Sequence, residues 1–309
     1  MKIVITGAGF IGSALAEHLA SAGHDVHVVS RAKTWEYNVP NITYYSEDLT
    51  QGCTELEKAL ENADICICTA ANVGTLKFAL EPSLATENNI IDFNTMLALV
   101  TQENRPHTVI YLSSSSVYGQ CRNAKEGDNY NFGQGNVAGY AAAKVNGEFL
   151  FRGLCTRGIN LRIVRPFNVC GQFSTRTGVQ RDGFLVSNLT KAAKENKPLK
   201  LYNNESRCYI DIHDVVYFLD KLVADSNNPE KRGLGFYDIH NVVNPKNNYT
   251  NEEVAELIKE MSGTDACIEY VPNPGIDLLP TRKGSNAKMK ELYNPKVTLD
   301  RTIKNLLSL

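Results

Sequence analysis

Tyr140 and Lys144 stand four residues apart in the segment GYAAAKVNGEF, which runs from residue 139 to 149. Alanine is the best helix former, so the three alanines between them predict a helix. Residues four apart lie on the same face of a helix. An ammonium beside a phenol favours the phenolate, which would let the tyrosine pass protons near neutral pH. The spacing alone leaves a second interpretation open, in which two polar side chains decorate a helix surface by chance.

A glycine-rich turn near the start of the chain could hold a phosphate group. The β-branched run KIVIT (2–6) predicts a buried parallel strand, and GAGFIG follows it. Ile11, Leu15 and Leu19 then recur at helical spacing. A strand, a glycine turn and a helix form the context in which G-x-G-x-x-G binds a dinucleotide pyrophosphate. The alternative is a glycine turn kept for packing. The candidate cofactor-binding residues here are Gly7, Gly9, Phe10, Ile11 and Gly12.

The end of the predicted second strand, DVHVV (25–29), bears on the choice of cofactor. NAD-binding folds of this type usually carry an acidic residue at this position, which bonds the ribose hydroxyl. Here the chain continues with Ser30, Arg31, Ala32 and Lys33 and has no acid. A serine with two cations suits a 2′-phosphate, so Ser30, Arg31 and Lys33 favour NADP, with NAD as the alternative. In the competing interpretation Arg31 and Lys33 are solvated loop charges.

Strands and helices continue to alternate after this point. We expect strands within 41–50 and 63–71, a helix over 87–103, and a further strand in 107–119 that runs into four serines. Ligands of parallel sheets bind at the carboxyl ends of the strands, which is where these serines fall. Four serines could equally form a plain loop. The pattern predicts an α/β fold, a Rossmann-type doubly wound parallel sheet with a smaller C-terminal substrate-binding lobe.

The alternation breaks between about residues 172 and 204. We expect one helix followed by a strand in 183–202, an amphipathic helix over 211–223, and a strand at 236–242 that rejoins the main sheet. Thr250 and Glu253 form a capping box that opens a helix ending at Gly263. The predicted domains are a dinucleotide-binding domain, 1–166 with 205–243 returning to it, and a substrate-binding lobe, 167–204 and 244–309.

Composition excludes several classes of protein. The 309 residues are 43% hydrophobic and 21% charged, as in ordinary globular proteins. A net charge of −2 gives no electrostatic case for binding nucleic acid or an anionic membrane. No apolar run approaches the roughly 20 residues that span a bilayer, and no signal peptide is expected. The eight cysteines form no C-x-x-C pair, so we expect reduced thiols, no metal site and a cytoplasmic protein. Cys66 and Cys68 are expected on opposite faces of a strand.

Six motifs stand in order along the chain: TGAGFIG, ADICICTAA, ENNI (87–90), LSSSSVYG (112–119), YAAAK (140–144) and RPFNVCG (165–171). Together with RCYIDIHD (207–214) they resemble the extended short-chain dehydrogenase/reductase family, which includes nucleotide-sugar epimerases, dehydratases and ketoreductases. The resemblance covers almost the whole chain. The departures are a glycine loop one residue shorter than usual, Cys170 in place of Tyr or Ala, and Asn203–Ser206 in place of Gly-Asp-Gly.

The resemblance implies a role for each matching residue. Tyr140 would transfer the proton, Ser114 would bond the same substrate oxygen, and Lys144 would also bind the nicotinamide ribose, so the catalytic residues are Ser114, Tyr140 and Lys144. Further cofactor-binding residues are Asp48 and Leu49 on the adenine side, Ala70 and Ala71 beside the cofactor, Asn89 on the helix behind the site, and Pro166 by the nicotinamide. Substrate-binding residues are Ser115, Ser116, Asn168, Arg207 and Arg282, of which the last three match positions that hold a diphosphate.

The two residues after Ser114 narrow the choice of reaction. Dehydratases of this family carry Asp-Glu there, whereas this chain has Ser115 and Ser116, so a 4,6-dehydratase is disfavoured. A 4-ketoreductase with NADPH and a 4-epimerase with NAD share the remaining residues. Ser30 and Arg31 favour the ketoreductase, acting on a nucleotide-diphosphate sugar, and the epimerase is the alternative. A non-catalytic NADP sensor is disfavoured because Ser114, Tyr140 and Lys144 are all present. The resemblance also implies a homodimer formed through the helix of Tyr140.

Overall fold

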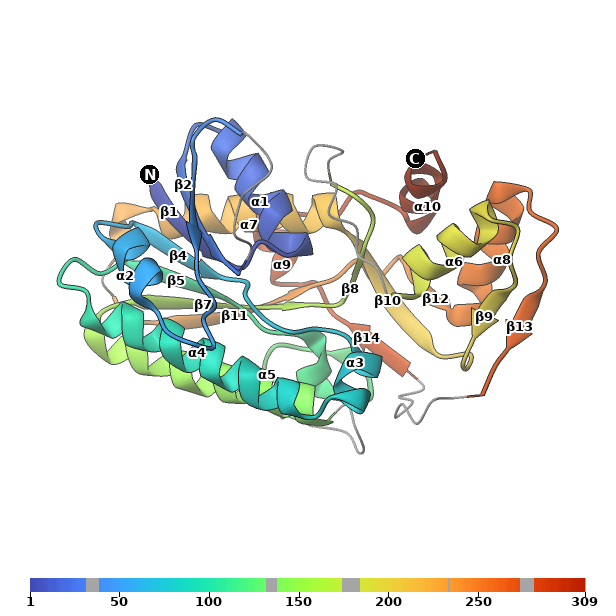
Figure 1. The fold of residues 1–309 in the computed structure, drawn as a ribbon, viewed down its shortest axis with the longest axis horizontal. Helices are drawn as coiled ribbons and strands as arrows, with labels where there is room; N and C mark the ends of the chain where they lie inside the picture. The colour runs from blue at the N-terminus through green and yellow to red at the C-terminus, as the bar shows by residue number, and fades with distance from the viewer. Residues whose placement is uncertain (32–38, 132–137, 174–183, 233, 273–280, 309) are drawn as a thin grey trace.

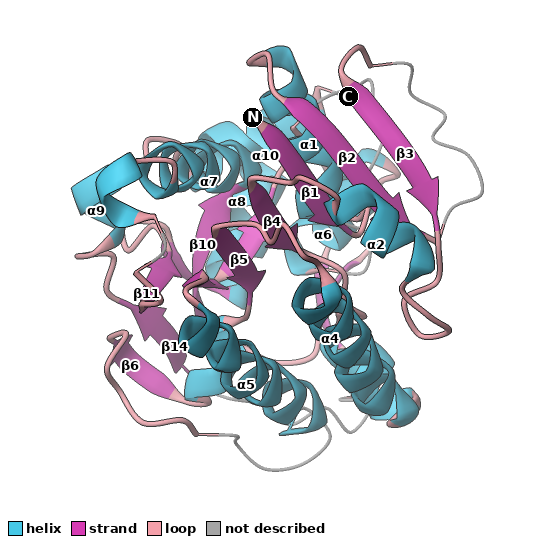
Figure 2. Ribbon diagram, turned by 90° about the vertical axis from the view of Figure 1, so that its left-hand side faces the viewer, coloured by secondary structure: helices cyan, strands magenta, loops and turns pink. Residues whose placement is uncertain are grey.

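A computed structural model describes residues 1–31, 39–131, 138–173, 184–232, 234–272 and 281–308. Its described part contains a seven-stranded parallel sheet with the strand order β11-β7-β5-β4-β1-β2-β3 (Figures 1 and 2). The strands are β1 Lys2–Thr6, β2 Asp25–Ser30, β3 Ile42–Ser46, β4 Ile65–Cys68, β5 Thr108–Leu112, β7 Asn160–Pro166 and β11 Tyr237–Val242. The predicted fold class is confirmed, and the strand expected at 236–242 does join this sheet.

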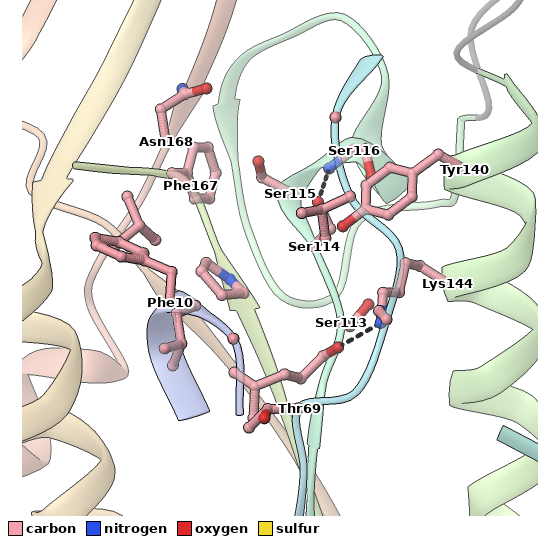
Figure 3. Close-up of a pocket in the computed structure, with 18 of the residues that line it drawn as sticks. Phe10, Thr69, Ser113, Ser114, Ser115, Ser116, Tyr140, Lys144, Phe167 and Asn168 are labelled. Carbon is pink, nitrogen blue, oxygen red and sulfur yellow. Dashed lines mark hydrogen bonds between the residues drawn. The ribbon is translucent and has the colours of Figure 1, made fainter. Parts of the chain in front are cut away.

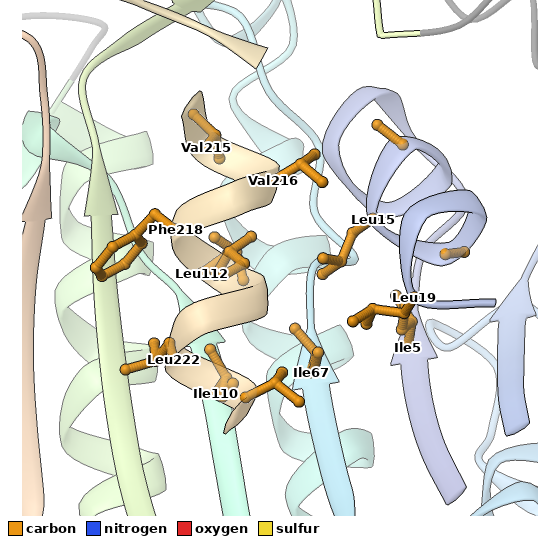
Figure 4. Close-up of a cluster of buried hydrophobic side chains, with 14 of the residues drawn as sticks. Ile5, Leu15, Leu19, Ile67, Ile110, Leu112, Val215, Val216, Phe218 and Leu222 are labelled. Atoms are coloured by element: carbon orange, nitrogen blue, oxygen red, sulfur yellow. The ribbon is translucent and has the colours of Figure 1, made fainter. Parts of the chain in front are cut away.

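Helices cover both faces of the sheet, because successive side chains of a buried strand point to opposite sides. Ile3 and Ile5 of β1 pack with one cluster, while Val4 packs with the other. On the first face lie α1 (Phe10–Ser21) and α7 (Ile212–Ser226), whose apolar residues meet Ile67 and Ile110 (Figure 4). The second face is covered by α2 (Thr54–Leu60), α4 (Ser83–Thr101) and α5 (Ala138–Arg152). Helix α4 begins four residues before the predicted start at 87.

A second unit lies at the right in Figure 1 and is built from segments far apart in the chain. Its larger sheet pairs β12, β10, β14 and β6, with β8 alongside β10. These strands span β6 Cys121–Ala124, β8 Asn168–Cys170, β10 Ser206–Asp211, β12 Asn248–Thr250 and β14 Thr281–Gly284. Strands β9 (Leu199–Leu201) and β13 (Ile268–Tyr270) pair beside helices α6 (Leu185–Lys194), α8 (Asn251–Ser262) and α10 (Leu299–Leu307).

The sheet pairing bears on the predicted domain boundaries, which stay a prediction. That prediction puts segment 205–243 in the dinucleotide-binding domain, but β10 pairs with the strands of the second unit, so the return to the main sheet begins with α7. Strand β6 lies within 1–166 and also pairs with the second unit. Short strands such as these carry too little pattern to reveal partners far away in the sequence.

All eight cysteines are free thiols. The Sγ atoms of Cys66 and Cys68 lie 3.9 Å apart, so the expectation of opposite faces is wrong: residues two apart in a strand share a face.

Among the described helices, none combines the length and the apolar composition needed to cross a membrane. In the same part of the chain, no three His, Cys, Asp or Glu side chains gather as metal ligands would.

Candidate active site

Helix α5 and the end of strand β5 bring the three predicted catalytic side chains to one cavity. Tyr140 and Lys144 project from the same face of α5, as their spacing predicts, and Ser114 follows β5 (Figure 3). The hydroxyl of Tyr140 points toward Ser114, and Lys144 lies one helical turn further along. A proton donor, a hydroxyl and an ammonium therefore face the same space.

Packing and one hydrogen bond hold the two helix residues in place. Lys144 is 4% exposed, and its Nζ donates to the carbonyl oxygen of Leu112 at 2.8 Å. The same nitrogen lies 5.0 Å from the centre of the Tyr111 ring. The Tyr140 ring meets Phe78 edge-on at 5.1 Å. The Tyr140 hydroxyl and the Lys144 ammonium are thus oriented by the sheet and its helices rather than by solvent-exposed loops. This favours a fixed geometry of the two groups.

The serine cluster is ordered by a tight turn. Ser114 caps a short 3-10 helix, Ser115–Tyr118, and its Oγ accepts the backbone N–H of Ser116 at 3.1 Å. Ser113 donates to Glu148 at 2.5 Å. The Oγ of Ser116 is buried and has no partner among the described residues. A buried hydroxyl without a partner in a cavity wall is a candidate for contact with a ligand.

The glycine turn after β1 fits a dinucleotide pyrophosphate. Gly7 has a φ of +86°, and a Cβ there would lie 2.6 Å from the Cα of Ala70, so only glycine is accommodated. A Cβ at Gly9 would meet nothing within 4 Å, which leaves its side of the turn open. Gly9 also caps α1 and has no side chain to satisfy the first N–H groups of the helix. The open side of the turn and the helix N-terminus form a cradle for an anion.

The cavity gathers most of the predicted residues. Its lining includes Gly9, Phe10, Ile11, Gly12, Ala71, Ser114, Ser115, Ser116, Tyr140, Lys144, Pro166, Asn168 and Arg282. Outside the lining lie Gly7, Ser30, Arg31, Asp48, Leu49, Ala70, Asn89 and Arg207. Lys33 falls outside the described residues.

Two of the residues outside the lining lie on the loop after β3. Asp48 accepts hydrogen bonds from the backbone and the hydroxyl of Thr50, at 2.9 and 2.8 Å. Burial opposes the ionisation of Asp48, but these bonds and the charge of Arg31 together lower the pKa of its carboxyl. Leu49 is buried in the core, and its carbonyl accepts from Asn94.

Asn89 accepts from Asn146 of α5, and this hydrogen bond lies on the outside of the molecule. The neighbouring residue Asn88 is 2% exposed and exchanges two hydrogen bonds with the backbone of Asn72, directly after Ala71. Asn88 is therefore the asparagine that supports the segment beside the cavity.

Two arginines stand side by side on the substrate side. Arg207 of β10 and Arg282 of β14 are register partners on parallel strands. Arg282 lines the cavity and donates to the carbonyl of Gly119, while Arg207 forms an ion pair with Glu205. The pKa of the Arg207 guanidinium is lowered mainly by burial and next by the charge of Arg282. Beside Glu205, a bound anion such as a phosphate group would further offset the repulsion between the Arg207 and Arg282 guanidinium groups.

The sequence did not identify several residues of the lining. Most of them lie inside the motifs already quoted, ADICICTAA, LSSSSVYG and RPFNVCG, so membership of a motif was the missed signal. The residues missed are Thr69, Val73, Gly74, Leu112, Ser113, Phe167, Val169 and Phe184. Glu148, which bonds Ser113, also escaped, although Tyr140, Lys144 and Glu148 continue the four-residue spacing along one helix face.

The chain is similar along its full length to curated enzymes. It is 26% identical over 326 residues to UDP-N-acetyl-alpha-D-glucosaminuronate decarboxylase of Bacillus cytotoxicus, with 99% of this chain and 96% of the relative covered. It is 28% identical over 316 residues to UDP-glucuronic acid decarboxylase 4 of Arabidopsis thaliana, with 97% of this chain and 66% of the relative covered.

Solved structures share the fold. MoeE5 in complex with UDP-glucose and NAD superposes with a TM-score of 0.83 at 22% identity, covering 100% of this chain and 98% of the other. A UDP-glucuronic acid 4-epimerase variant from Bacillus cereus, in complex with a fluorinated UDP-glucuronic acid and NAD, gives a TM-score of 0.83 at 21% identity, covering 100% of this chain and 98% of the other. Residues 3–238, more than half of the chain, match the model of the NAD dependent epimerase/dehydratase family, and the chain therefore belongs to that family.

Proposed function

We propose that this enzyme oxidises and reduces C4 of a nucleotide-diphosphate sugar, and that it is an NAD-dependent 4-epimerase. The observation that carries the proposal is the chemistry of the cavity. In the described lining, Tyr140, Lys144 and Arg282 are the ionisable side chains, and no carboxylate, imidazole or thiol accompanies them. Such a set can move one proton at one carbon, which is what alcohol oxidation and ketone reduction need.

Each residue has a role in this proposal. Bound dinucleotide supplies the hydride acceptor and donor. Tyr140 takes the proton of the C4 hydroxyl in one direction and returns it in the other. Ser114 hydrogen-bonds the same oxygen, and the Lys144 ammonium favours the phenolate while Tyr140 is without its proton.

The substrate side of the cavity supports a diphosphate ligand. We assign Asn168, Arg207 and Arg282 to the diphosphate, because two register-paired arginines present the charge that two phosphates need. Ser115 and Ser116 are assigned to the sugar, since both lie in the wall next to Ser114.

Decarboxylation would begin with the same step. Oxidation at C4 of a uronic acid places a ketone β to the carboxylate, from which CO₂ can leave without a further base. An elimination of water, by contrast, needs the acid and base that Ser115 and Ser116 do not supply. The family relatives named as decarboxylases therefore differ from an epimerase after the first step.

The test is to incubate the purified chain with UDP-glucose, UDP-N-acetylglucosamine and UDP-glucuronic acid and to identify the products. A 4-epimer formed without net consumption of dinucleotide supports the proposal. Release of CO₂ from UDP-glucuronic acid with formation of a UDP-pentose would replace it by a decarboxylase. Stoichiometric oxidation of NADPH with a 4-keto sugar would replace it by the ketoreductase.

The ketoreductase remains the second candidate, because Ser30 ends β2 and Arg31 follows it, where an acid would select NAD. Two observations weigh against it. The charge of Arg31 acts on Asp48, so an ionised carboxylate already competes for it. The structural neighbours MoeE5 and the Bacillus cereus epimerase both carry NAD.

Arg31→Ala should separate the two cofactors. We expect the dissociation constant for NADPH to rise about five- to tenfold and that for NADH to change less than about twofold, because one charged hydrogen bond to the 2′-phosphate is lost. Fluorescence titration of the two reduced dinucleotides measures both constants. Asp48→Asn is the matched variant and should tighten NADPH. Equal weakening of both dinucleotides by Arg31→Ala would mean that Arg31 lies away from the 2′-position.

An apolar stripe on the outside of α4 and α5 supports the expected homodimer. Ile90, Phe93 and Leu97 recur at helical spacing on α4 and are 37%, 58% and 41% exposed, and Phe149 of α5 is 54% exposed. We propose that a second copy of the chain covers this stripe, because side chains of this size gain about 1.5–3 kcal/mol each on full burial.

Phe93→Glu is expected to convert the dimer to a monomer, since the new carboxylate would be buried at the interface. Analytical ultracentrifugation at micromolar concentration measures the change. Tyr202→Glu, at a 45% exposed aromatic of the second unit, should leave the dimer intact. A wild-type chain that sediments as a monomer would contradict the proposal.

The free state of all eight cysteines supports the predicted cytoplasmic location.

A further inference from the structure

A carboxylate is buried behind the catalytic lysine. Asp92 of α4 is 5% exposed, and its Oδ2 accepts the hydroxyl hydrogen of Tyr111 at 2.7 Å. Tyr111 belongs to β5, the strand that leads to the serine cluster, and is 1% exposed. Asp92 does not line the cavity, and none of the roles assigned above uses it.

Tyr111 connects this carboxylate to Lys144. The Lys144 nitrogen lies over the face of the Tyr111 ring, 5.0 Å from its centre, while Asp92 holds the hydroxyl at the ring's edge. A phenol that donates to a carboxylate becomes richer in electrons, which strengthens the attraction of its ring for a cation. The hydrogen bond and the cation–ring contact therefore reinforce each other.

Gly147 of α5 leaves room for the hydrogen bond between Tyr111 and Asp92. A Cβ on Gly147 would lie 2.1 Å from the Tyr111 hydroxyl and 2.4 Å from Asp92 Oδ2. Gly147 follows Lys144 by three residues, on the part of α5 that packs against α4. Any other residue at 147 would push apart the pair that meets there.

The Asp92 carboxyl gains or loses its proton not far below neutral pH. Burial raises the pKa of its carboxyl to about 6, although the charge of Lys144 and the hydrogen bond from Tyr111 both favour the ionised form. The titratable groups coupled to Asp92 in the described part of the chain are Lys144 of α5, Tyr111 of β5 and Cys68 of β4. Lys144 is the cation among them.

We propose that Asp92 is a positioning residue that acts on Lys144 through Tyr111, holding the ammonium at the floor of the cavity where the dinucleotide binds. The proposal rests on the assignment of Lys144 to the cofactor. This contact adds to the hydrogen bond that Lys144 donates to Leu112, and a lysine held less firmly would lose more side-chain freedom when it binds the ribose.

Binding of NADH to the purified full-length chain tests the proposal without any sugar substrate. Asp92→Asn removes the charge and keeps the shape, and it should raise the dissociation constant for NADH about three- to tenfold. In a Lys144→Met background the same substitution should have no effect, because the residue through which it acts is gone. Glu103→Gln, which removes an exposed carboxylate just past the end of α4, is the matched control and should bind NADH as the wild type does.

Acidification should imitate the substitution. We expect NADH affinity of the wild type to fall as the pH drops from about 7.5 to about 5, while Asp92→Asn, which has no proton to take up at this position, should lack that step. Equal effects of Asp92→Asn in the wild-type and Lys144→Met backgrounds, or tighter NADH binding by Asp92→Asn, would overturn the proposal.

A second variant keeps the test decisive if Asp92→Asn does not fold. Tyr111→Phe retains the ring and removes the hydroxyl, so it should weaken NADH binding only when Lys144 is present; weakening in both backgrounds would overturn the proposal. The NADH measurements are independent of the sugar reaction. Failure of the chain to act on any UDP-sugar would refute the proposed function and leave the inference about Asp92 to be judged by binding.

Discussion

Replacing Tyr140 by phenylalanine is expected to lower turnover by about 10²–10⁴-fold, the range that a positioned proton donor contributes. The substitution removes one oxygen and leaves the ring that meets Phe78 at 5.1 Å, so the cavity should keep its shape. In the described lining no carboxylate, imidazole or thiol could take over the proton transfer. Steady-state kinetics on the UDP-sugar that the wild type converts measures the loss.

The dissociation constant for NADH should be nearly unchanged in Tyr140→Phe, because Lys144 and the glycine turn remain. Tyr217→Phe is a matched control: it removes the same oxygen from a tyrosine that is 41% exposed on α7, and it should not affect turnover. Equal turnover in wild type and Tyr140→Phe would remove Tyr140 from the mechanism. A parallel loss of NADH binding would indicate a cofactor contact instead.

The sequence predicts best those parts of the fold whose conformation is decided by residues a few positions apart in the chain. Thr250 and Glu253 do form the reciprocal capping box that opens α8, and Gly263 ends the helix with a φ of 66°. The glycine turn between β1 and α1 is equally local. In each case the residues that decide the conformation lie within a few positions of one another, so their pattern is visible without the rest of the chain.

Long-range pairing was not predictable in the same way. Strands β6 and β14 are four residues each and come from opposite halves of the chain, yet they pair with each other. Such short segments show neither a clear alternation nor a partner. Their position follows from the packing of the second unit, which the sequence pattern does not reveal.

Two adjacent asparagines show how much a shift of one position along a helix matters for a site. The resemblance points to Asn89, whereas Asn88 is the buried neighbour that bonds Asn72. Successive residues of a helix point about 100° apart, so a shift by one position exchanges an inward side chain for an outward one. The prediction for Tyr140 and Lys144 is less sensitive to such a shift, because their spacing of four fixes their common face wherever the helix begins.

Removing one member of the buried Glu148–Arg165 pair is expected to destabilise the protein by about 3–5 kcal/mol, because the other charge is left buried without its partner. Glu148 is fully buried and accepts two hydrogen bonds from Arg165, at 2.9 and 2.7 Å. It also accepts from Ser113 and Tyr130. Glu148→Gln therefore disturbs the strand end that carries the serine cluster, and turnover should fall together with stability.

Chemical denaturation of Glu148→Leu, Arg165→Met and the double variant Glu148→Leu/Arg165→Met, with Glu148→Gln beside them, measures the effect. The double variant should lose less stability than the sum of the two single losses, since it leaves no charge buried alone. Lys58→Met, which breaks the exposed pair with Glu55, should leave the unfolding midpoint unchanged. Additive losses would show that the two residues act separately. Because Ser113 joins this pair directly to the cavity wall, a loss of turnover in Glu148→Gln parallel to the loss of stability would show that the buried pair also supports the serine cluster.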